Sequence, residues 1–459
     1  MKISRPGRLT LSTLSLLMAT TPVLSQNGPG LVGTLSFDQT LSFDSNPDLV
    51  VTPGDGKIVS TTDLNFSLSS ETRSERFRFN VGGVFDGAFG SGATSADDLT
   101  FKNESASLTY GREGANSSLS LRARYSNFDI EDEVFGFFVD GIFDPDALII
   151  DGGERERTLL TGRLEFGKEG PLGVEVRARN NVVDYTGVTD PELVDSESNS
   201  LNAVATIRTN RAWNINLSAG IERTDEEDIN DTSWRSNYLG VGIEGEFNNG
   251  LSYSADLYRD EADNYQLGSL TNQEEGLGFA VGLTQLVPDG SYGVSVGSRV
   301  DSSGRRNTAN VNRLFELPNG GLSLSLGLVE QDGSDTDITA TVVYSREGRD
   351  SRIEAELVQE PSTNDGDALL NTSVNITYER DINAYSSWDA NFSYGASSSI
   401  GASNGDTRTS ASLGYTRNLT EDWDLRAGVS IDRIEQSGSG DITSNSVFVS
   451  VGRDFSFGF

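Results

Sequence analysis

Most of the carboxy-terminal residues 447–459 alternate between apolar and small or polar side chains. Phe455, Phe457 and Phe459 share one parity, which the valines at 447, 449 and 451 continue upstream. Alternation with a period of two residues predicts a β-strand with one apolar face. A chain end usually frays in water, so three phenylalanines there are unusual for a soluble protein. The pattern favours a final membrane strand whose aromatic residues sit at the lipid–water boundary.

This ending resembles the assembly signal of Gram-negative outer-membrane β-barrels. The resemblance rests on Phe455, Phe457 and Phe459, and Arg453 on the same face is the one departure. It implies that the C-terminal strand is recognised by the barrel-assembly machinery. It also implies insertion in the cell outer membrane, in contact with membrane lipid and lipopolysaccharide.

The amino terminus has the features of a secretory signal peptide. Lys2, Arg5 and Arg8 precede an apolar run at 9–20, and small residues suited to cleavage end at Ser25. No later stretch approaches the roughly 18 to 20 unbroken apolar residues of a membrane helix. We therefore expect a signal peptide at 1–25 and a single β-barrel domain at 26–459, without a helical anchor.

The composition excludes several function classes. The chain has no cysteine and no histidine, so it lacks disulfides, the commonest general base and the commonest metal ligand. We expect no enzyme activity, no catalytic residues, no cofactor and no metal centre. The net charge of −34 repels nucleic acid. Acidic loops that bind divalent ions and an acidic proteome adapted to salt both remain open as explanations of that charge.

Short two-faced segments repeat along the chain, separated by turn residues. Clear examples are 64–68, 119–125, 172–178, 213–221 and 239–247. Hydrophobic residues make up only 35% of the chain, which suits a wall that needs them on one face of each strand. We predict an all-β fold, a single transmembrane antiparallel up-and-down barrel of about 22 strands, an even number between about 18 and about 24. Such a barrel leaves no room for the plug of a TonB-dependent receptor.

The connections alternate in length, as they do in outer-membrane barrels. Counting back from the last strand places turns at 248–250, 288–290 and 318–320 on the periplasmic side. The same count places long loops at 46–58, 129–154, 186–198 and 260–272 outside. Short periplasmic turns and long external loops are typical of this class.

A weak hairpin repeat adds a second resemblance. Residues 413–425 are similar to 376–390, and 205–213 is a looser copy. The spacing resembles porin-like barrels, including a type associated with exopolysaccharide export.

Ionisable residues occupy the face opposite the apolar one, where they would line the lumen. Rows of arginines and carboxylates there would select permeants by charge, although pairing that merely fills the interior is the commoner role for any single residue. The pore-lining candidates are Arg122, Arg124, Arg163, Arg177, Arg179, Arg208, Glu165, Glu175, Glu244, Glu246, Glu354 and Glu356.

The predicted loop 129–154 is unusually apolar for a segment in water. It resembles the inward-folded constriction loop of porins, and packing on the rim or contact with a partner are the alternatives. Its candidate constriction residues are Glu131, Asp132, Glu133, Asp140, Asp144 and Asp146.

The sequence thus favours a porin-like channel for small polar or cationic solutes. A barrel of about 22 strands is wide enough that known examples are plugged. Export of a polysaccharide or another bulky substrate with a partner is therefore one alternative. A structural or adhesion barrel with a closed lumen is another. The substrate and the oligomeric state, including a homo-oligomer, stay open.

Overall fold

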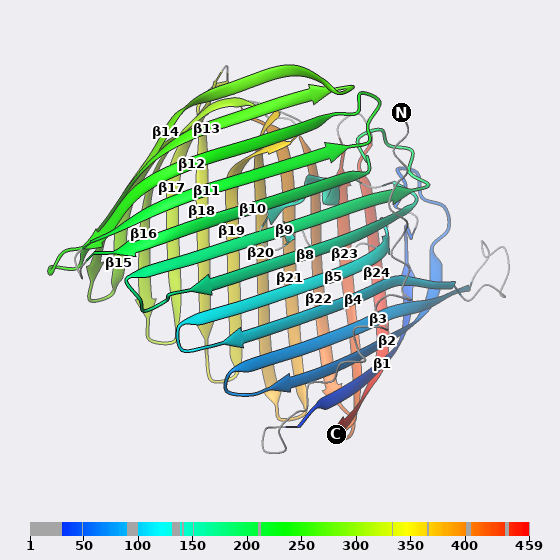
Figure 1. The fold of residues 1–459 in the computed structure, drawn as a ribbon. Coiled ribbons are helices and arrows are strands. Elements are labelled where there is room, and N and C mark those ends of the chain that lie inside the picture. The colour runs from blue at the N-terminus through cyan, green and yellow to red at the C-terminus, as the bar shows by residue number, and fades with distance from the viewer. Residues whose placement is uncertain are drawn as a thin grey trace.

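The chain folds into a wall of antiparallel strands in which each strand pairs with its neighbours in sequence (Figure 1). The computed structural model describes residues 30–47, 49–89, 100–130, 138–139, 142–149, 151–209, 213–332, 334–364, 367–400, 405–436 and 440–458. The wall strands are β1 (Val32–Asp44), β2 (Lys57–Glu71), β3 (Glu75–Phe89), β4 (Thr100–Glu113), β5 (Ser117–Asp129), β8 (Glu154–Phe166), β9 (Leu172–Thr186), β10 (Ser196–Arg208), β11 (Trp213–Glu226), β12 (Ser233–Glu246), β13 (Leu251–Gln266), β14 (Ser269–Val287), β15 (Gly290–Asp301), β16 (Gly304–Leu317), β17 (Gly320–Gln331), β18 (Asp337–Glu347), β19 (Ser351–Asn364), β20 (Asp367–Asn383), β21 (Ser386–Ser399), β22 (Asp406–Asn418), β23 (Trp423–Glu435) and β24 (Ile442–Gly458).

The connection between β5 and β8 carries small elements of its own. These are the strands β6 (Phe138–Val139) and β7 (Ile142–Phe143), which pair with each other, and the 3-10 turn η2 (Pro145–Leu148). Within the described residues, no helix is both long and apolar enough to cross a membrane. The predicted signal peptide at 1–25 lies outside the described residues.

The wall is a closed barrel of 22 strands, as the sequence predicts. β1 pairs with β2 on one side and with β24 on the other, and the β1–β24 register runs from Val32 opposite Gly458 to Asp44 opposite Ser446. Closure gives each of the 22 described wall strands a hydrogen-bonded neighbour on both sides. Lipid offers no hydrogen bonds, so this pairing is what allows a sheet to span a membrane.

The outer face of the wall is apolar. One parity of each strand presents large hydrophobic side chains to the surroundings, such as Leu121, Leu160, Leu201, Leu217 and Leu239. The opposite parity carries polar and charged side chains. This division follows directly from the period-two pattern, because alternate residues of a strand point to opposite faces of the sheet.

Tight turns close the predicted periplasmic hairpins. Pro288 and Asp289 connect β14 to β15, and Pro318 and Asn319 connect β16 to β17. Gly290 follows its turn at φ +132°, where a Cβ would meet the Leu314 carbonyl oxygen at 2.0 Å. A side chain cannot be accommodated there, which explains why glycine ends this turn.

One predicted long loop is wrong. Residues 260–272 are not a loop, because β13 and β14 continue through them and are joined by a two-residue turn. Leu267 and Gly268 both have positive φ, +50° and +71°, as a type I′ hairpin turn requires. The polar composition of 260–272 predicts an exposed segment, but an exposed segment can still be a paired strand.

The end of the chain lies on the outer face of the barrel. Phe455 and Phe457 are exposed there, at 41% and 39%, and Phe459 lies outside the described residues. Arg453, the departure from the apolar pattern, is held 5.2 Å from the ring of Trp423 and 4.4 Å from that of Phe455. Its guanidinium also lies 3.5 Å from the carboxylate of Asp422 in the β22–β23 turn. Cation–π contacts and an ion pair at the rim therefore accommodate this charge.

The β1–β24 closure can be tested by cross-linking. Because the chain contains no cysteine, Leu41→Cys and Val449→Cys, which are register partners, should form an efficient disulfide. A cross-link that joins the two end strands makes the chain nearly circular, so the heated, unreduced protein should migrate anomalously on a denaturing gel. The control pair Leu41→Cys and Phe455→Cys is out of register and should not cross-link. Equal cross-linking of the two pairs would contradict the register.

Candidate transport lumen

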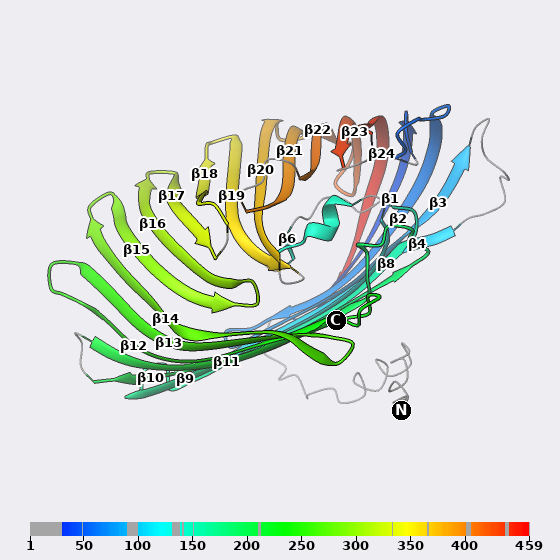
Figure 2. The same cartoon turned by 90° about the horizontal axis from the view of Figure 1, so that it is seen from above.

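The inner face of the wall is identified by a segment that touches strands on two sides of the barrel. Residues 144–149, which we call the strut, lie inside the ring of strands (Figure 2). Asp144 pairs with Arg155 and Arg157 of β8, whereas the Ala147 carbonyl accepts a hydrogen bond of 3.2 Å from Arg408 of β22. Only a segment in the interior can reach both walls. The parity of Arg155 on β8 and of Arg408 on β22 is therefore the inward parity.

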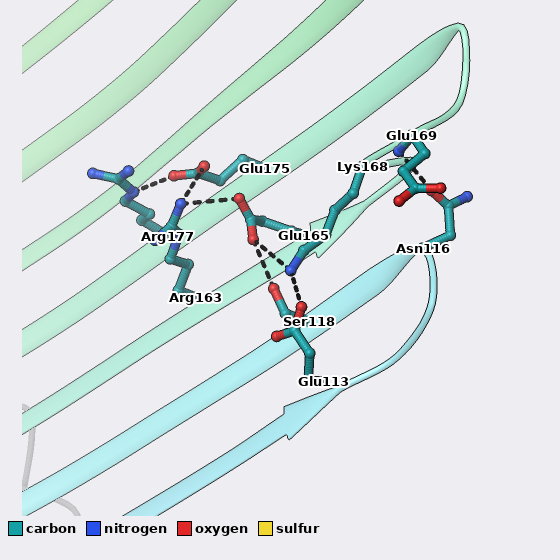
Figure 3. Close-up of polar contacts among 9 residues, drawn as sticks. All are labelled: Glu113, Asn116, Ser118, Arg163, Glu165, Lys168, Glu169, Glu175 and Arg177. Atoms are coloured by element: carbon teal, nitrogen blue, oxygen red, sulfur yellow. Dashed lines mark hydrogen bonds and ion pairs between the residues drawn. The ribbon is translucent and has the colours of Figure 1, made fainter. Parts of the chain in front are cut away.

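All twelve pore-lining candidates lie on this inward parity, but they differ in the contacts that they make. Four of them form one network at the periplasmic ends of β8 and β9 (Figure 3). Arg163 donates at 2.9 Å to both Glu165 and Glu175, and Arg177 is paired with Glu175. Lys168 in the following turn extends the network to Glu113, 2.5 Å away. These side chains hold each other in fixed positions against the wall.

The other candidates are dispersed. The guanidinium of Arg208 donates at 2.7 and 2.9 Å to the carbonyls of Gly167 and Gly170, so it secures the β8–β9 turn. Glu244 accepts a 3.3 Å hydrogen bond from Asn214, and Glu354 pairs with Arg352. Arg122, Arg124, Arg179, Glu246 and Glu356 share the inward parity.

The strut belongs to the predicted constriction loop. Asp144 and Asp146 belong to it, whereas Glu131, Asp132, Glu133 and Asp140 lie outside the described residues. The Arg157 guanidinium lies 2.6 Å from the Asp144 carboxylate, and the Tyr185 hydroxyl donates to Asp146 at 2.7 Å. The two aspartates thus anchor the strut to β8 and β9 through three side chains.

Burial shows that the strut is packed. Leu148 is 1% exposed, Arg155 is 4% exposed and Arg408 is 3% exposed. Beside them, Ile130, Ile149 and Leu193 form an apolar cluster that joins this loop to the β9–β10 loop. Buried arginines are costly unless charged partners and carbonyls satisfy them, and the strut supplies both. It therefore occupies the lumen as part of the fold.

The pKa values of the two strut carboxylates are shifted in opposite directions. Burial alone would raise the pKa of Asp144, but Arg155 and Arg157 together hold the pKa below its ordinary value. Burial and the neighbouring Asp144 charge raise the pKa of Asp146 to about 6, although Arg155, the Tyr185 hydroxyl and Arg157 lower it. Asp146 therefore titrates near pH 6.

The strut divides the lumen at its level. Between its two anchor points, β8 and β22, the shorter way around the barrel runs through β5, β4, β3, β2, β1, β24 and β23. A segment that joins β8 to β22 across the interior is a chord, with these strands on one side and β9–β21 on the other. Solutes that cross the barrel at this level must pass on one side of the chord.

An acidic groove of about 1250 Å³ follows the wall from β20 and β21 through β23, β24 and β1 to β3. It extends from Asp44 and Pro47, at the predicted extracellular end of β1, to Glu379 and Asp381, at the predicted periplasmic end of β20. Its charged lining residues are Asp38, Asp44, Asp63, Asp86, Glu379, Asp381, Asp389, Asp424 and one cation, Arg426. The groove therefore spans the height of the barrel with a strong excess of negative charge.

Three of these carboxylates come together across four strands. Asp38 pairs in register with Asp63 on β2 and with Gly452 on β24, and Gly452 pairs with Asp424 on β23. A Cβ at Gly452 would meet the Asp38 and Asp424 carboxylates at 2.3 and 2.8 Å. Glycine is thus the only residue that lets both lie against the wall. We call Asp38, Asp63 and Asp424 the acidic row.

Sequence reasoning missed both the acidic row and the partners of the strut. The parity of Asp38 was visible, since Ser36, Thr40 and Ser42 share it opposite Leu35, Phe37 and Leu41. The approach of Asp38 to Asp424 was not visible in the sequence, because it depends on the pairing of β1 with β24. Among the described residues, no group of three or more acidic side chains has an arrangement suited to a metal ion.

Comparison with known proteins supports the fold. No protein-family model and no curated protein matches the chain. Among solved structures, a mutant of the ferric enterobactin receptor from Pseudomonas aeruginosa is similar at a TM-score of 0.54 and 10% identity, over 94% of this chain and 81% of that one. The siderophore receptor PirA from Acinetobacter baumannii (TM-score 0.53, 10% identity, 93% and 81%) and the copper transporter OprC (0.53, 10%, 94% and 81%) are also similar. With its closed sheet and apolar outer band, the chain is a large outer-membrane β-barrel.

Removal of the central anchor should free the strut. Asp144→Ala removes the carboxylate that pairs with Arg155 and Arg157, and breaking a buried ion pair costs about 3–5 kcal/mol. We expect 144–149 to become susceptible to protease added to the intact folded barrel. The control Glu169→Gln changes an exposed side chain in the β8–β9 turn and should leave the strut protected. Equal protection of the Asp144→Ala variant would show that the anchor is not needed.

The strut should be held more tightly in acid. The pKa of Asp146 is raised in the folded state, so its contribution to stability is fully present below its ordinary pKa and is lost as pH rises through about 6. The groups that face it are Asp144, Arg155, Arg157 and Tyr185. Hydrogen exchange of 144–149, corrected for intrinsic rates, should show a larger opening free energy at about pH 5 than at about pH 7.5. Asp146→Asn should remove the difference, and a change of opposite sign would refute the assignment.

Proposed function

We propose that this protein is an outer-membrane channel that lets small polar and cationic solutes diffuse along the acidic groove. The observation that carries the proposal is the groove itself, which extends from one rim of the barrel to the other beside the strut. Carboxylates along a narrow path attract cations and raise their local concentration. The similar structures are those of receptors and a copper transporter, which supports transport as the general role.

The strut would set the size limit of this path. A barrel of 22 strands is wide, and an open lumen of that width would let large solutes leak. By crossing from β8 to β22, the strut leaves the acidic groove as a narrower passage along the wall. The acidic row would then select solutes by charge, and the strut would select them by size.

The test is single-channel recording of the refolded protein in a planar bilayer under a salt gradient. We expect discrete conductance steps and a reversal potential that indicates cation preference. Replacing the acidic row by Asp38→Asn, Asp63→Asn and Asp424→Asn should lower the cation-to-anion permeability ratio by a factor of about 3 or more, because three charges beside the path are removed.

The matched control removes three charges from exposed turns, Glu169→Gln, Asp335→Asn and Glu421→Gln, and should leave the ratio within error. Equal effects of the two triple variants would mean that only net charge matters. A folded barrel that never conducts would overturn free diffusion. That result would favour export of a bulky substrate with a partner, or a structural barrel whose lumen is closed.

A further inference from the structure

A second cavity lies on the wall away from the acidic groove. It has a volume of about 370 Å³ and is formed by β8, β9, β10 and β12 near the periplasmic end. Its polar lining includes Glu175, Arg177, Asn202 and Arg208, and the ring of Tyr238 closes one side. Volumes of this order hold small organic ligands. The cavity lies on β8–β12, whereas the acidic groove lies on β20–β24 and β1–β3.

The position of the Tyr238 ring depends on a glycine, Gly220, in the neighbouring strand β11. A Cβ at Gly220 would meet the Tyr238 ring at 2.2 Å, so the ring takes the space that a side chain on β11 would fill. The Tyr238 hydroxyl donates to the Asn202 side-chain oxygen at 3.0 Å. Ring and amide are therefore fixed together against the wall. This gives the cavity one apolar surface beside polar groups.

The charged lining residues are also positioned in advance. Glu175 is held by Arg163 and Arg177, and Arg208 is held over Gly173 by the β8–β9 turn carbonyls (Figure 3 shows the Glu175 pairs). Guanidinium and carboxylate groups offer two parallel donors or acceptors each. Rigid groups bind a ligand with little further loss of conformational entropy.

We propose that this cavity binds a saccharide unit at the wall of the lumen. A pyranose has two apolar C–H faces, which pack on an aromatic ring, and a rim of hydroxyls, which pair with guanidinium, carboxylate and amide groups. The cavity provides both kinds of surface, with cations and carboxylates nearly balanced, in a chain whose net charge is −34. A simple cation would favour the acidic groove instead. The inference deepens the proposed channel function by naming a class of solute.

The test is calorimetric titration of the full chain, refolded in detergent, with maltohexaose and with trigalacturonate. We expect binding of at least one of the two. Tyr238→Ala should weaken it by about tenfold or more, because an aromatic anchor is removed, and Arg177→Ala should weaken it in the same direction. Tyr238→Phe keeps the ring and should bind within a factor of about 3 of the unchanged protein, since it loses only the hydroxyl.

The control Tyr292→Ala removes an exposed tyrosine of the outer face and should have no effect. Gel mobility that changes on heating verifies that each variant has folded. Absence of binding of both oligosaccharides would overturn the inference. So would trigalacturonate binding that survives Tyr238→Ala, since that would be charge attraction alone. Titration does not require current, so a conducting barrel that binds no saccharide refutes only this site, and a binding barrel that never conducts refutes only the channel.

Discussion

The pairing of β1 with β24 is the constraint on which the rest of this structure depends. A membrane supplies no water to satisfy backbone amides and carbonyls, so a spanning sheet must close on itself. Closure gives every strand an outer face in lipid and an inner face in a wide lumen. The outer face is then restricted to apolar side chains. The inner face is free to carry most of the unusual chemistry of the chain.

The lumen uses that freedom to separate charges. Carboxylates of β20–β24 and β1–β3 gather in one groove, whereas arginines of β5, β8, β9 and β10 occupy another part of the wall. Inward glycines such as Gly452 and Gly220 let the long side chains of neighbouring strands lie flat. Gly452 makes room for Asp38 and Asp424, and Gly220 makes room for Tyr238. The wall is therefore charged and structured without being filled.

The strut converts a wide barrel into a divided one. Its charged anchors, Arg155, Arg157 and Arg408, are inward residues that would be costly to bury without Asp144 and the Ala147 carbonyl. The strut thus supplies polar partners for the arginines of the wall, and these arginines hold the strut in place. Because burial raises the pKa of Asp146 to about 6, the stability of the contact between them depends on pH.

Local patterns predicted the wall, and long-range contacts determined the site. The strand number and the turns at 288–290 and 318–320 follow from alternation and from proline and glycine, which act over a few residues. The acidic row could not be predicted, because Asp38 and Asp424 meet only after the two ends of the chain pair. The docking of Asp144 on Arg155 was hidden for a similar reason, since an apolar acidic loop is equally compatible with a constriction and with packing on the rim. The polar residues at 260–272 correctly indicated an exposed segment, but they did not reveal that the segment is a paired hairpin.

The most direct test of the account is to lock the strut to β22. Ala147→Cys and Arg408→Cys, in a chain without other cysteines, place one thiol on the strut and one on the strand that it contacts. A short bismaleimide should join them within one chain at high yield, and single-channel recording of the linked protein should show one steady, low conductance level. Failure of the cross-link in a folded barrel would contradict the account. So would a linked barrel whose conductance fluctuates as freely as before.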